Sequence, residues 1–223
     1  MKKLVAICML FLLIISVFIF PLGSAGSSVF YISLAFAACA LFLSSWKGGI
    51  RRGLEYLGLG MPKRKEVPLL AAQSFALFVA CAAVTVAITG IFLLAGALDT
   101  KNVYDKVILL PVPALILAFT LAPIGEEMFF RGFLFRRASE WLGKRMAANR
   151  GAMGNMPWVA GAILSSLLFS LMHASYGSLA ELAVAFAVGF VLCIGVKKTG
   201  SLLPAVLAHA AFNFVSIFMA VFL

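Results

Sequence analysis

Residues 67–98 read VPLLAAQSFALFVACAAVTVAITGIFLLAGAL and contain no charged side chain. A helix needs about 20 apolar residues to cross the roughly 30 Å hydrocarbon core of a bilayer. The rest of the chain has the same character: 64% of its 223 residues are hydrophobic, 12% are charged, and the mean hydropathy is +1.11. A soluble domain is about 45–50% apolar and about 25% charged. The composition therefore excludes a water-soluble globular protein and predicts an all-α, polytopic membrane protein, with residues 1–223 forming a single membrane domain.

Seven apolar runs are long enough to be membrane-spanning helices. They cover residues 4–20, 28–46, 67–98, 107–125 or beyond, 157–173, 179–196 and 201–223. The first is followed by Gly23-Ser24-Ala25-Gly26, which resembles a signal-peptide cleavage region. Its length of about 17 residues exceeds the roughly 7–15 apolar residues of a signal peptide, which favours an uncleaved first helix. The Gly- and Pro-containing segment 48–65 is expected to be a loop.

The basic residues are distributed unevenly over the expected loops. The chain has 18 Lys and Arg against 8 Asp and Glu, a formal charge of +10. With the N-terminus inside, 16 of the 18 basic residues fall in inner segments, and the outer loops hold only Lys101 and Lys106. This positive-inside asymmetry predicts a cytoplasmic N-terminus and an external C-terminus, in a bacterial plasma membrane. The basic loops have few aromatic residues for stacking on bases, so membrane lipid is an expected partner and nucleic acid is not.

The first three apolar runs are nearly free of ionisable side chains. The later runs contain Glu126, Glu127, His173 and His209, together with the amide of Asn213. Because an ionisable group in a bilayer is costly, such residues usually face a cavity or a partner. We therefore expect residues 107–223 to contain the functional site, whereas residues 1–106 are less informative.

The two glutamates differ in their spacing to Arg131. Glu127 and Arg131 are four residues apart, which suits an ion pair on one helix face. Glu126 is rotated by about 100° from Glu127 and cannot share that arginine equally well. A desolvated carboxylate without a cation binds a proton readily and can act as a general base. The alternative is that both glutamates mark the inner membrane interface, where they are solvated and paired with Arg131, Arg136 and Arg137.

His209 and Asn213 are four residues apart and share a helix face, as do Phe169 and His173. A single histidine in a membrane helix more often forms an interhelical hydrogen bond than it catalyses a reaction. Here two histidines, one free carboxylate and one amide can converge from three helices. Together they offer a base, its orienting partner and two oxyanion donors, as amide hydrolysis requires.

These residues resemble the motifs of the CPBP family, the CAAX protease and bacteriocin-processing (Abi) family of membrane endopeptidases. The matching motifs are Glu126-Glu127-x-x-x-Arg131, Phe169-x-x-x-His173 and His209-x-x-x-Asn213, within residues 121–214. The resemblance implies a CAAX-endopeptidase-like helical bundle and an intramembrane peptidase. It implies that Glu126 and His173 activate water, that His209 and Asn213 stabilise the oxyanion, and that Glu127 and Arg131 are a supporting pair.

The resemblance also implies a peptide or a prenylated protein C-terminus as substrate, and a glutamate mechanism without a metal. A zinc site formed by Glu126, His173 and His209 is the alternative. The second functional hypothesis is a non-catalytic membrane scaffold or a bacteriocin-immunity protein. The third hypothesis is a proton-relay transporter, which the absence of sequence repeats makes less favoured.

The expected topology sets one geometric condition on this site. His173 lies about 24 Å along its helix from the inner end, at 1.5 Å per residue, whereas Glu126 is nearer the inner face. The two residues can approach only if the fourth helix continues past Arg131 and if the fifth helix starts below the interface or tilts.

Overall fold

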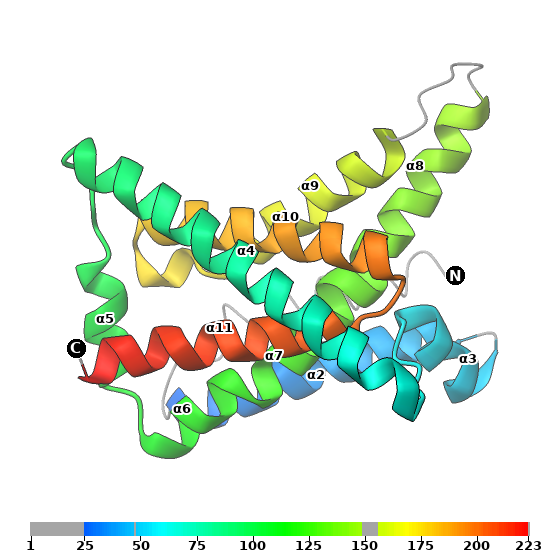
Figure 1. Cartoon of the computed structure of the whole chain (residues 1–223), viewed down its shortest axis with the longest axis horizontal. Coiled ribbons are helices and arrows are strands. Elements are labelled where there is room, and N and C mark those ends of the chain that lie inside the picture. Colours follow the sequence, from blue (N-terminus) through cyan, green and yellow to red (C-terminus); the bar gives the residue numbers. More distant parts are fainter. Residues whose placement is uncertain (1–24, 47, 149–155, 223) are drawn as a thin grey trace.

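The computed structural model describes residues 25–46, 48–148 and 156–222. All regular structure in these residues is helical (Figure 1). The principal helices are α2 (Ala25–Ser45), α3 (Gly49–Leu57), α4 (Val67–Leu94), α5 (Lys101–Ile108), α6 (Val112–Phe119), α7 (Leu121–Glu127), α8 (Arg136–Ala148), α9 (Met156–Leu171), α10 (Leu179–Thr199) and α11 (Leu203–Phe222). A π-helix, η2 (Met128–Phe135), joins α7 to α8, and the short 3₁₀-helices η1 (Arg64–Glu66) and η3 (Ala174–Tyr176) precede α4 and follow α9.

Five helical segments of the described chain are long and apolar enough to cross a membrane, or six if α2 and α3 count as one bent span. They correspond to the expected spans from the second to the seventh, which confirms the polytopic all-α class. The expected first span, at residues 4–20, lies outside the described residues.

Two sequence expectations about segment boundaries were wrong. The segment 48–65 is not all loop, because α3 forms an amphipathic helix there, with Gly53 and Leu57 buried and its arginines exposed. The fourth span does not start at residue 107. Pro111 precedes α6, which has a further proline in its first turn, and Pro fixes a backbone angle that suits this position. Residues 101–108 instead form the separate helix α5.

The regular α-helix of the fourth span is interrupted at Thr120, between α6 and α7, and the helical segment then continues. Pro123 lacks an N–H group and its ring crowds the carbonyl four residues earlier, which weakens the helix around Thr120. Beyond Glu127 the chain passes through η2 into α8, so a single helical segment extends from Val112 to Arg145. The fourth helix therefore continues past Arg131, as the approach of Glu126 and His173 requires.

The helices pack around an aromatic core. α4 crosses one side of the bundle and contacts α10 and α11, while α9 packs between α8 and α10 (Figure 1). α2 packs on α7 and η2. The rings of Phe36, Phe129, Phe130 and Phe169 form a continuous chain of contacts, with neighbouring centroids 5.0–5.4 Å apart. These rings enclose the charged groups described next.

The closest packing between α2 and α7 depends on a glycine. A Cβ atom on Gly125 would lie 2.2 Å from the backbone oxygen of Ser33. Only glycine allows the two backbones to approach this closely. Gly125 therefore sets the position of the helical turn that carries Glu126 and Glu127.

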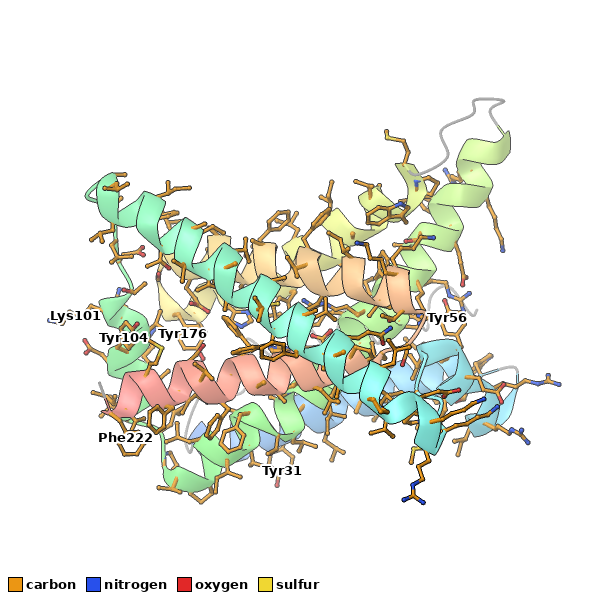
Figure 2. All side chains as sticks on the ribbon, in the orientation of Figure 1. Tyr31, Tyr56, Lys101, Tyr104, Tyr176 and Phe222 are labelled. Atoms are coloured by element: carbon orange, nitrogen blue, oxygen red, sulfur yellow. The ribbon has the colours of Figure 1, made fainter. Side chains whose placement is uncertain are left out.

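The bundle has two distinct ends, which we call the α3 end and the α5 end. Tyr56, on α3, lies at one, and Lys101, Tyr104, Tyr176 and Phe222 lie at the other (Figure 2).

Candidate active site

Glu127 and Arg131 form an ion pair inside the bundle. Arg131 Nη1 lies 2.8 Å from Glu127 Oε1, and both side chains are fully buried. The pair expected from the spacing is thus present, and the interfacial, solvated alternative is wrong for Glu127. The guanidinium carbon also lies 4.1 Å from the ring centroid of Phe169, within the range of a cation–π contact.

A glycine on α10 makes room for this guanidinium. A Cβ atom on Gly189 would lie 2.9 Å from Arg131 Nη2 and 3.3 Å from Ser166. A larger residue at position 189 would displace the arginine from Glu127. A glycine within an apolar helix often marks close packing, and this is the one weak signal from which the role of Gly189 could have been inferred.

His209 lies between the two glutamates. Its Nδ1 is 2.8 Å from Glu127 Oε1, and its Nε2 is 3.8 Å from Glu126 Oε2. The carboxylate of Glu127 accepts hydrogen bonds, so Nδ1 is the donor and carries a proton. The other ring nitrogen, Nε2, is the one that faces Glu126. One carboxylate orients the imidazole, and the other stands opposite its second nitrogen.

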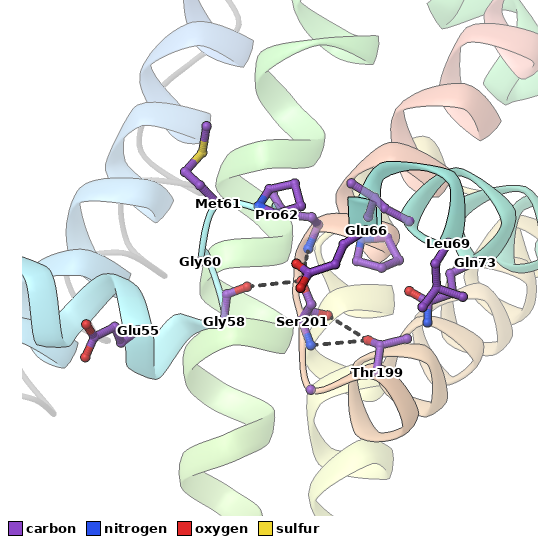
Figure 3. A pocket seen from close by; sticks show the side chains of 14 residues that line it. Glu55, Gly58, Gly60, Met61, Pro62, Glu66, Leu69, Gln73, Thr199 and Ser201 are labelled. Atoms are coloured by element: carbon purple, nitrogen blue, oxygen red, sulfur yellow. Dashed lines mark hydrogen bonds between the residues drawn. The ribbon is translucent and has the colours of Figure 1, made fainter. Parts of the chain in front are cut away.

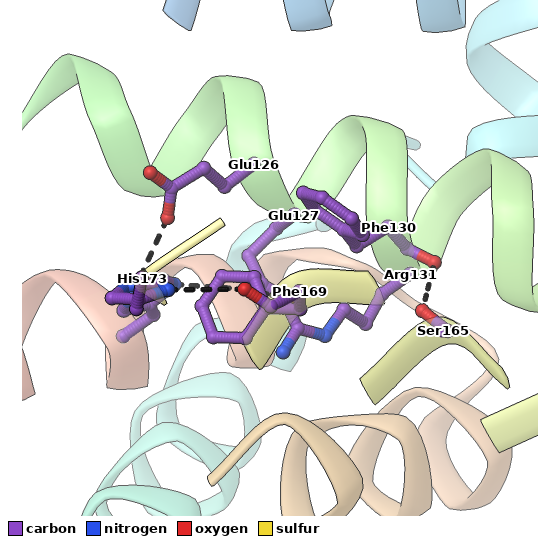
Figure 4. A network of polar contacts seen from close by, with 8 residues as sticks. Glu126, Glu127, Phe130, Arg131, Ser165, Phe169 and His173 are labelled. Atoms are coloured by element: carbon purple, nitrogen blue, oxygen red, sulfur yellow. Dashed lines mark hydrogen bonds and ion pairs between the residues drawn. The ribbon is translucent and has the colours of Figure 1, made fainter. Parts of the chain in front are cut away.

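The two carboxylates differ in their access to solvent. The side chain of Glu126 is 22% exposed, whereas that of Glu127 is completely buried and that of His209 is 4% exposed. Within this cluster, Glu126 is the carboxylate that water or a substrate can reach. Figure 4 shows Glu126 on the neighbouring face of the helix from Glu127 and Arg131.

His173 follows the last residue of α9 and is oriented by that helix. Its Nδ1 lies 3.0 Å from the backbone oxygen of Phe169 (Figure 4). A carbonyl oxygen can only accept, so Nδ1 donates and Nε2 remains an acceptor in the neutral ring. The ring centroid of Phe169 is 4.9 Å from that of His173 and 5.8 Å from that of His209. Both imidazoles therefore flank the same phenyl ring.

Asn213 connects α11 to the break between α6 and α7. Its Nδ2 donates to the backbone oxygen of Ala118 at 2.9 Å. This contact is the interhelical hydrogen bond expected of a structural asparagine. An amide nitrogen has two N–H groups, so one donor is not used by this bond.

The structure thus joins four of the six candidate residues by direct contacts: Arg131, Glu127, His209 and Glu126. His173 is connected to these four by the ring of Phe169, which contacts both His173 and His209. Asn213 is one helical turn beyond His209 on α11. Within the described part of the chain, no three His, Cys, Asp or Glu side chains are close enough together to hold a metal ion. The zinc alternative formed by Glu126, His173 and His209 therefore has no preformed site there.

A cavity of about 540 Å³ lies at the α3 end (Figure 3). It is bounded by the start of α4 and the turn between α10 and α11, and its polar lining includes Glu66, Thr199 and Ser201. None of the six candidate residues lines it. The cavity is therefore separate from the histidine and glutamate cluster.

Comparison with known proteins agrees with the resemblance drawn from the motifs. Residues 107–215 match the family described as type II CAAX prenyl endopeptidase Rce1-like. An uncharacterized 24.3 kDa protein of Escherichia coli is 34% identical over 137 residues, which cover 57% of this chain and 56% of that protein. The chain thus spans little more than half the length of this relative. No solved structure gives a significant match.

The matched residues 107–215 hold all six candidate residues, and this match to the Rce1-like family is consistent with the CPBP family.

Proposed function

We propose that this chain is an intramembrane endopeptidase of the glutamate type, acting in a bacterial plasma membrane with its N-terminus in the cytoplasm. The observation that carries the proposal is the position of His209, whose two nitrogens face Glu127 at 2.8 Å and Glu126 at 3.8 Å. A buried carboxylate that orients a histidine beside a second, reachable carboxylate is a typical arrangement for acid–base chemistry. The family match of residues 107–215 supports a peptide bond as the target.

Glu126 is the proposed general base. Its carboxylate takes one proton from a water molecule while the water oxygen bonds to the carbonyl carbon of the substrate. His173 assists, because its Nε2 can accept the second water hydrogen when Nδ1 donates to Phe169 O. When the tetrahedral intermediate collapses, the C–N bond breaks and the protonated Glu126 gives its proton to the leaving amine.

His209 and Asn213 are the proposed oxyanion donors. His209 would donate from Nε2, with Glu127 accepting from Nδ1–H and holding the ring. Asn213 would donate from the N–H group that Ala118 does not use. Donors that are fixed before the reaction stabilise developing charge without reorganisation, and they are usually a large part of catalysis. Glu127 and Arg131 then act as positioning residues.

The proposed substrate is a short peptide or a prenylated protein C-terminus. The site lies inside a bundle of membrane-spanning helices, so a segment that is held in the bilayer by a lipid would reach it without leaving the membrane. Membrane lipid is the surrounding partner.

The decisive experiment is cleavage of a fluorogenic prenylated peptide by the purified protein in detergent. We expect turnover by the wild type and none by Glu126→Gln, with both proteins folded. A chelator arm tests the zinc alternative, because a metal-free mechanism is unaffected by metal removal. Equal peptide binding by both proteins without cleavage by either would favour the non-catalytic scaffold and contradict the proposal.

A further inference from the structure

Asp99 joins the loop after α4 to the start of α10. Its carboxylate accepts hydrogen bonds from the hydroxyl of Ser178 at 2.7 Å, from Leu179 N at 2.6 Å and from Ala180 N at 3.1 Å. Ser178 in turn accepts from Glu181 N and caps α10. The first N–H groups of a helix have no partner within the helix, and here the carboxylate of Asp99 accepts from two of them, 80 and 81 positions later in the chain.

Two residues of α5 bind the same turn from the same side. Asn102 Nδ2 donates to the backbone oxygen of Gly177 at 3.2 Å, and Lys106 Nζ donates to that of Ser175. Asp99, Asn102 and Lys106 are spaced by three and four residues, which places the latter two on one face of α5. The three side chains together hold both sides of the turn at residues 174–178.

This turn begins directly after His173. The histidine lies two residues beyond the last residue of α9, which still holds it from one side: its backbone N–H donates to Ser170 O at 2.8 Å and its Nδ1 lies 3.0 Å from Phe169 O. On the other side, its backbone oxygen accepts from Tyr176 N at 3.0 Å. Tyr176 lies between Ser175 and Gly177, the two residues that α5 anchors. His173 is therefore held between α9 and the turn, and the turn is itself bonded to α5.

Lys106 also explains one feature of the charge distribution. It is one of two basic residues that the expected topology places outside, against 16 inside. A lysine that donates to a backbone oxygen of the turn has a structural reason to be there.

We infer that Asp99, Asn102 and Lys106, here named the α5 clamp, are positioning residues that hold the imidazole of His173 in place for the reaction. The catalytic part of this inference rests on the proposed function; the geometric part does not. Breaking the α5 clamp should move His173 while leaving His209 where Glu127 holds it.

Chemical modification tests the geometric part without any enzymatic assay. Purified full-length wild type, Asp99→Ala and the control Asp105→Ala would be treated with diethyl pyrocarbonate, and modification of His173 and His209 followed by mass spectrometry. We expect His173 to react severalfold faster in Asp99→Ala, with His209 unchanged. Asp105 is exposed on the same helix and makes no contact with the turn among the described residues, so its variant should behave as wild type.

Hydrogen exchange in the same samples shows whether the clamp is broken. The amides of Leu179 and Ala180 should lose protection in Asp99→Ala. Loss of that protection with an unchanged rate at His173 would overturn the inference. If Asp99→Ala does not fold, Asn102→Ala, which removes one bond only, is measured in the same way and decides the question.

Kinetics test the catalytic part. Because a displacement of about 1 Å can cost up to about 100-fold in rate, we expect kcat of Asp99→Ala to fall by about 10- to 100-fold with KM within about twofold. Asp99→Asn keeps an acceptor oxygen and should be intermediate. An unchanged kcat together with faster modification of His173 would show that His173 has no role in the reaction and would contradict the catalytic part. A wild type without turnover would contradict the proposed function, but the result of the modification experiment would still test the geometric part.

Discussion

Glu127 and His209 are 82 positions apart in the chain, yet their side chains meet at 2.8 Å in the buried core. The same oxygen of Glu127 also binds Arg131 at 2.8 Å. One carboxylate atom therefore holds an arginine on its own helical segment and an imidazole on α11. This shared contact makes Glu127 a support for both the fold and the site.

Loss of either member of the buried ion pair should destabilise the protein. Arg131→Ala leaves Glu127 charged in the core, and Glu127→Gln leaves Arg131 without a counterion. Breaking a buried pair in this way costs about 3–5 kcal/mol. We expect a much lower melting temperature and folded yield in detergent for both variants.

Glu126→Gln should retain the stability of the wild type to within about 1 kcal/mol, because its side chain is reachable by solvent and has no bonded partner closer than His209 at 3.8 Å. It should nevertheless lose activity. A fully folded but inactive Glu127→Gln beside an active Glu126→Gln would mean that the two carboxylates have the opposite roles.

Gly125→Ala should disrupt the packing of α2 on α7. The added methyl group would lie 2.2 Å from the backbone oxygen of Ser33, so the helices must separate. Overpacking of this kind costs about 1–3 kcal/mol, measured as a lower melting temperature. Gly90→Ala is the matched control, because no atom lies within 4 Å of a Cβ at that position in α4. If both variants melt alike, the close approach of the two helices is not required.

The class of fold could be predicted from the sequence because the bilayer leaves few choices. A chain in hydrocarbon must pair its own backbone groups, so a long uncharged run such as 67–98 becomes a helix. The pair between Glu127 and Arg131 could be predicted for a similar reason, since both residues lie within one helical turn. Local spacing carries this kind of information.

Contacts between distant segments could not be predicted in the same way. The sequence indicated that His209 belongs to the site, but its bond to Glu127 depends on how α7 and α11 pack. The partner of Asn213 is a backbone oxygen, which every residue has, so no residue type identifies Ala118. The α5 clamp was missed because Asp99 is nearly 80 positions from Ser178. The short helix α3 was missed because glycines and a proline flank it.

The orientation of the chain in the membrane can be tested by cysteine labelling. Gly53 is an unsuitable site, because it is buried and a Cβ there would meet Ser45. Arg52 and Lys101 are both exposed. Arg52 lies on α3 with Tyr56, and Figure 2 shows Tyr56 and Lys101 at opposite ends of the bundle. In a variant without the natural cysteines, an impermeant thiol reagent should label Lys101→Cys from outside intact cells but not Arg52→Cys. Labelling of Arg52→Cys alone would reverse the orientation.

The bonds to Asp99 should make stability depend on pH in the acid range. Hydrogen bonds from Ser178 and then from Leu179 hold the pKa of the Asp99 carboxyl below its usual value of about 3.9. A lowered pKa in the folded state means that these bonds contribute stability above the ordinary pKa and lose it as the pH falls through the lowered value.

The melting temperature of the wild type should therefore fall more steeply below about pH 4 than that of Asp99→Ala. The other charged groups on the elements around Asp99 are Lys101, Asp105 and Lys106 on α5, with Glu181 in the first turn of α10 and Lys197 and Lys198 in its last turn. They are present in both proteins. The difference between the two curves isolates Asp99. Parallel curves down to about pH 3 would show that its bonds do not contribute to stability.

The variant Asn213→Ala distinguishes a structural role of this amide from a catalytic one. Asn213→Ala removes its bond to Ala118, and an interhelical hydrogen bond in a membrane protein contributes about 0.6 kcal/mol on average. Loss of one oxyanion donor typically lowers turnover by about 100- to 1,000-fold with little effect on substrate binding. We expect a nearly unchanged melting temperature, an unchanged KM and a kcat at least about tenfold lower.

Ser74→Ala provides a control for this variant, because Ser74 also bonds a backbone oxygen, that of Leu70 within the same helix α4, but lies outside the candidate site. It should change stability little and keep its turnover. Thermal unfolding and cleavage of the fluorogenic peptide would be measured on the same preparations. An Asn213→Ala protein that melts much earlier yet cleaves at the wild-type rate would assign the amide to helix packing alone. The oxyanion would then have to be stabilised by His209 without it.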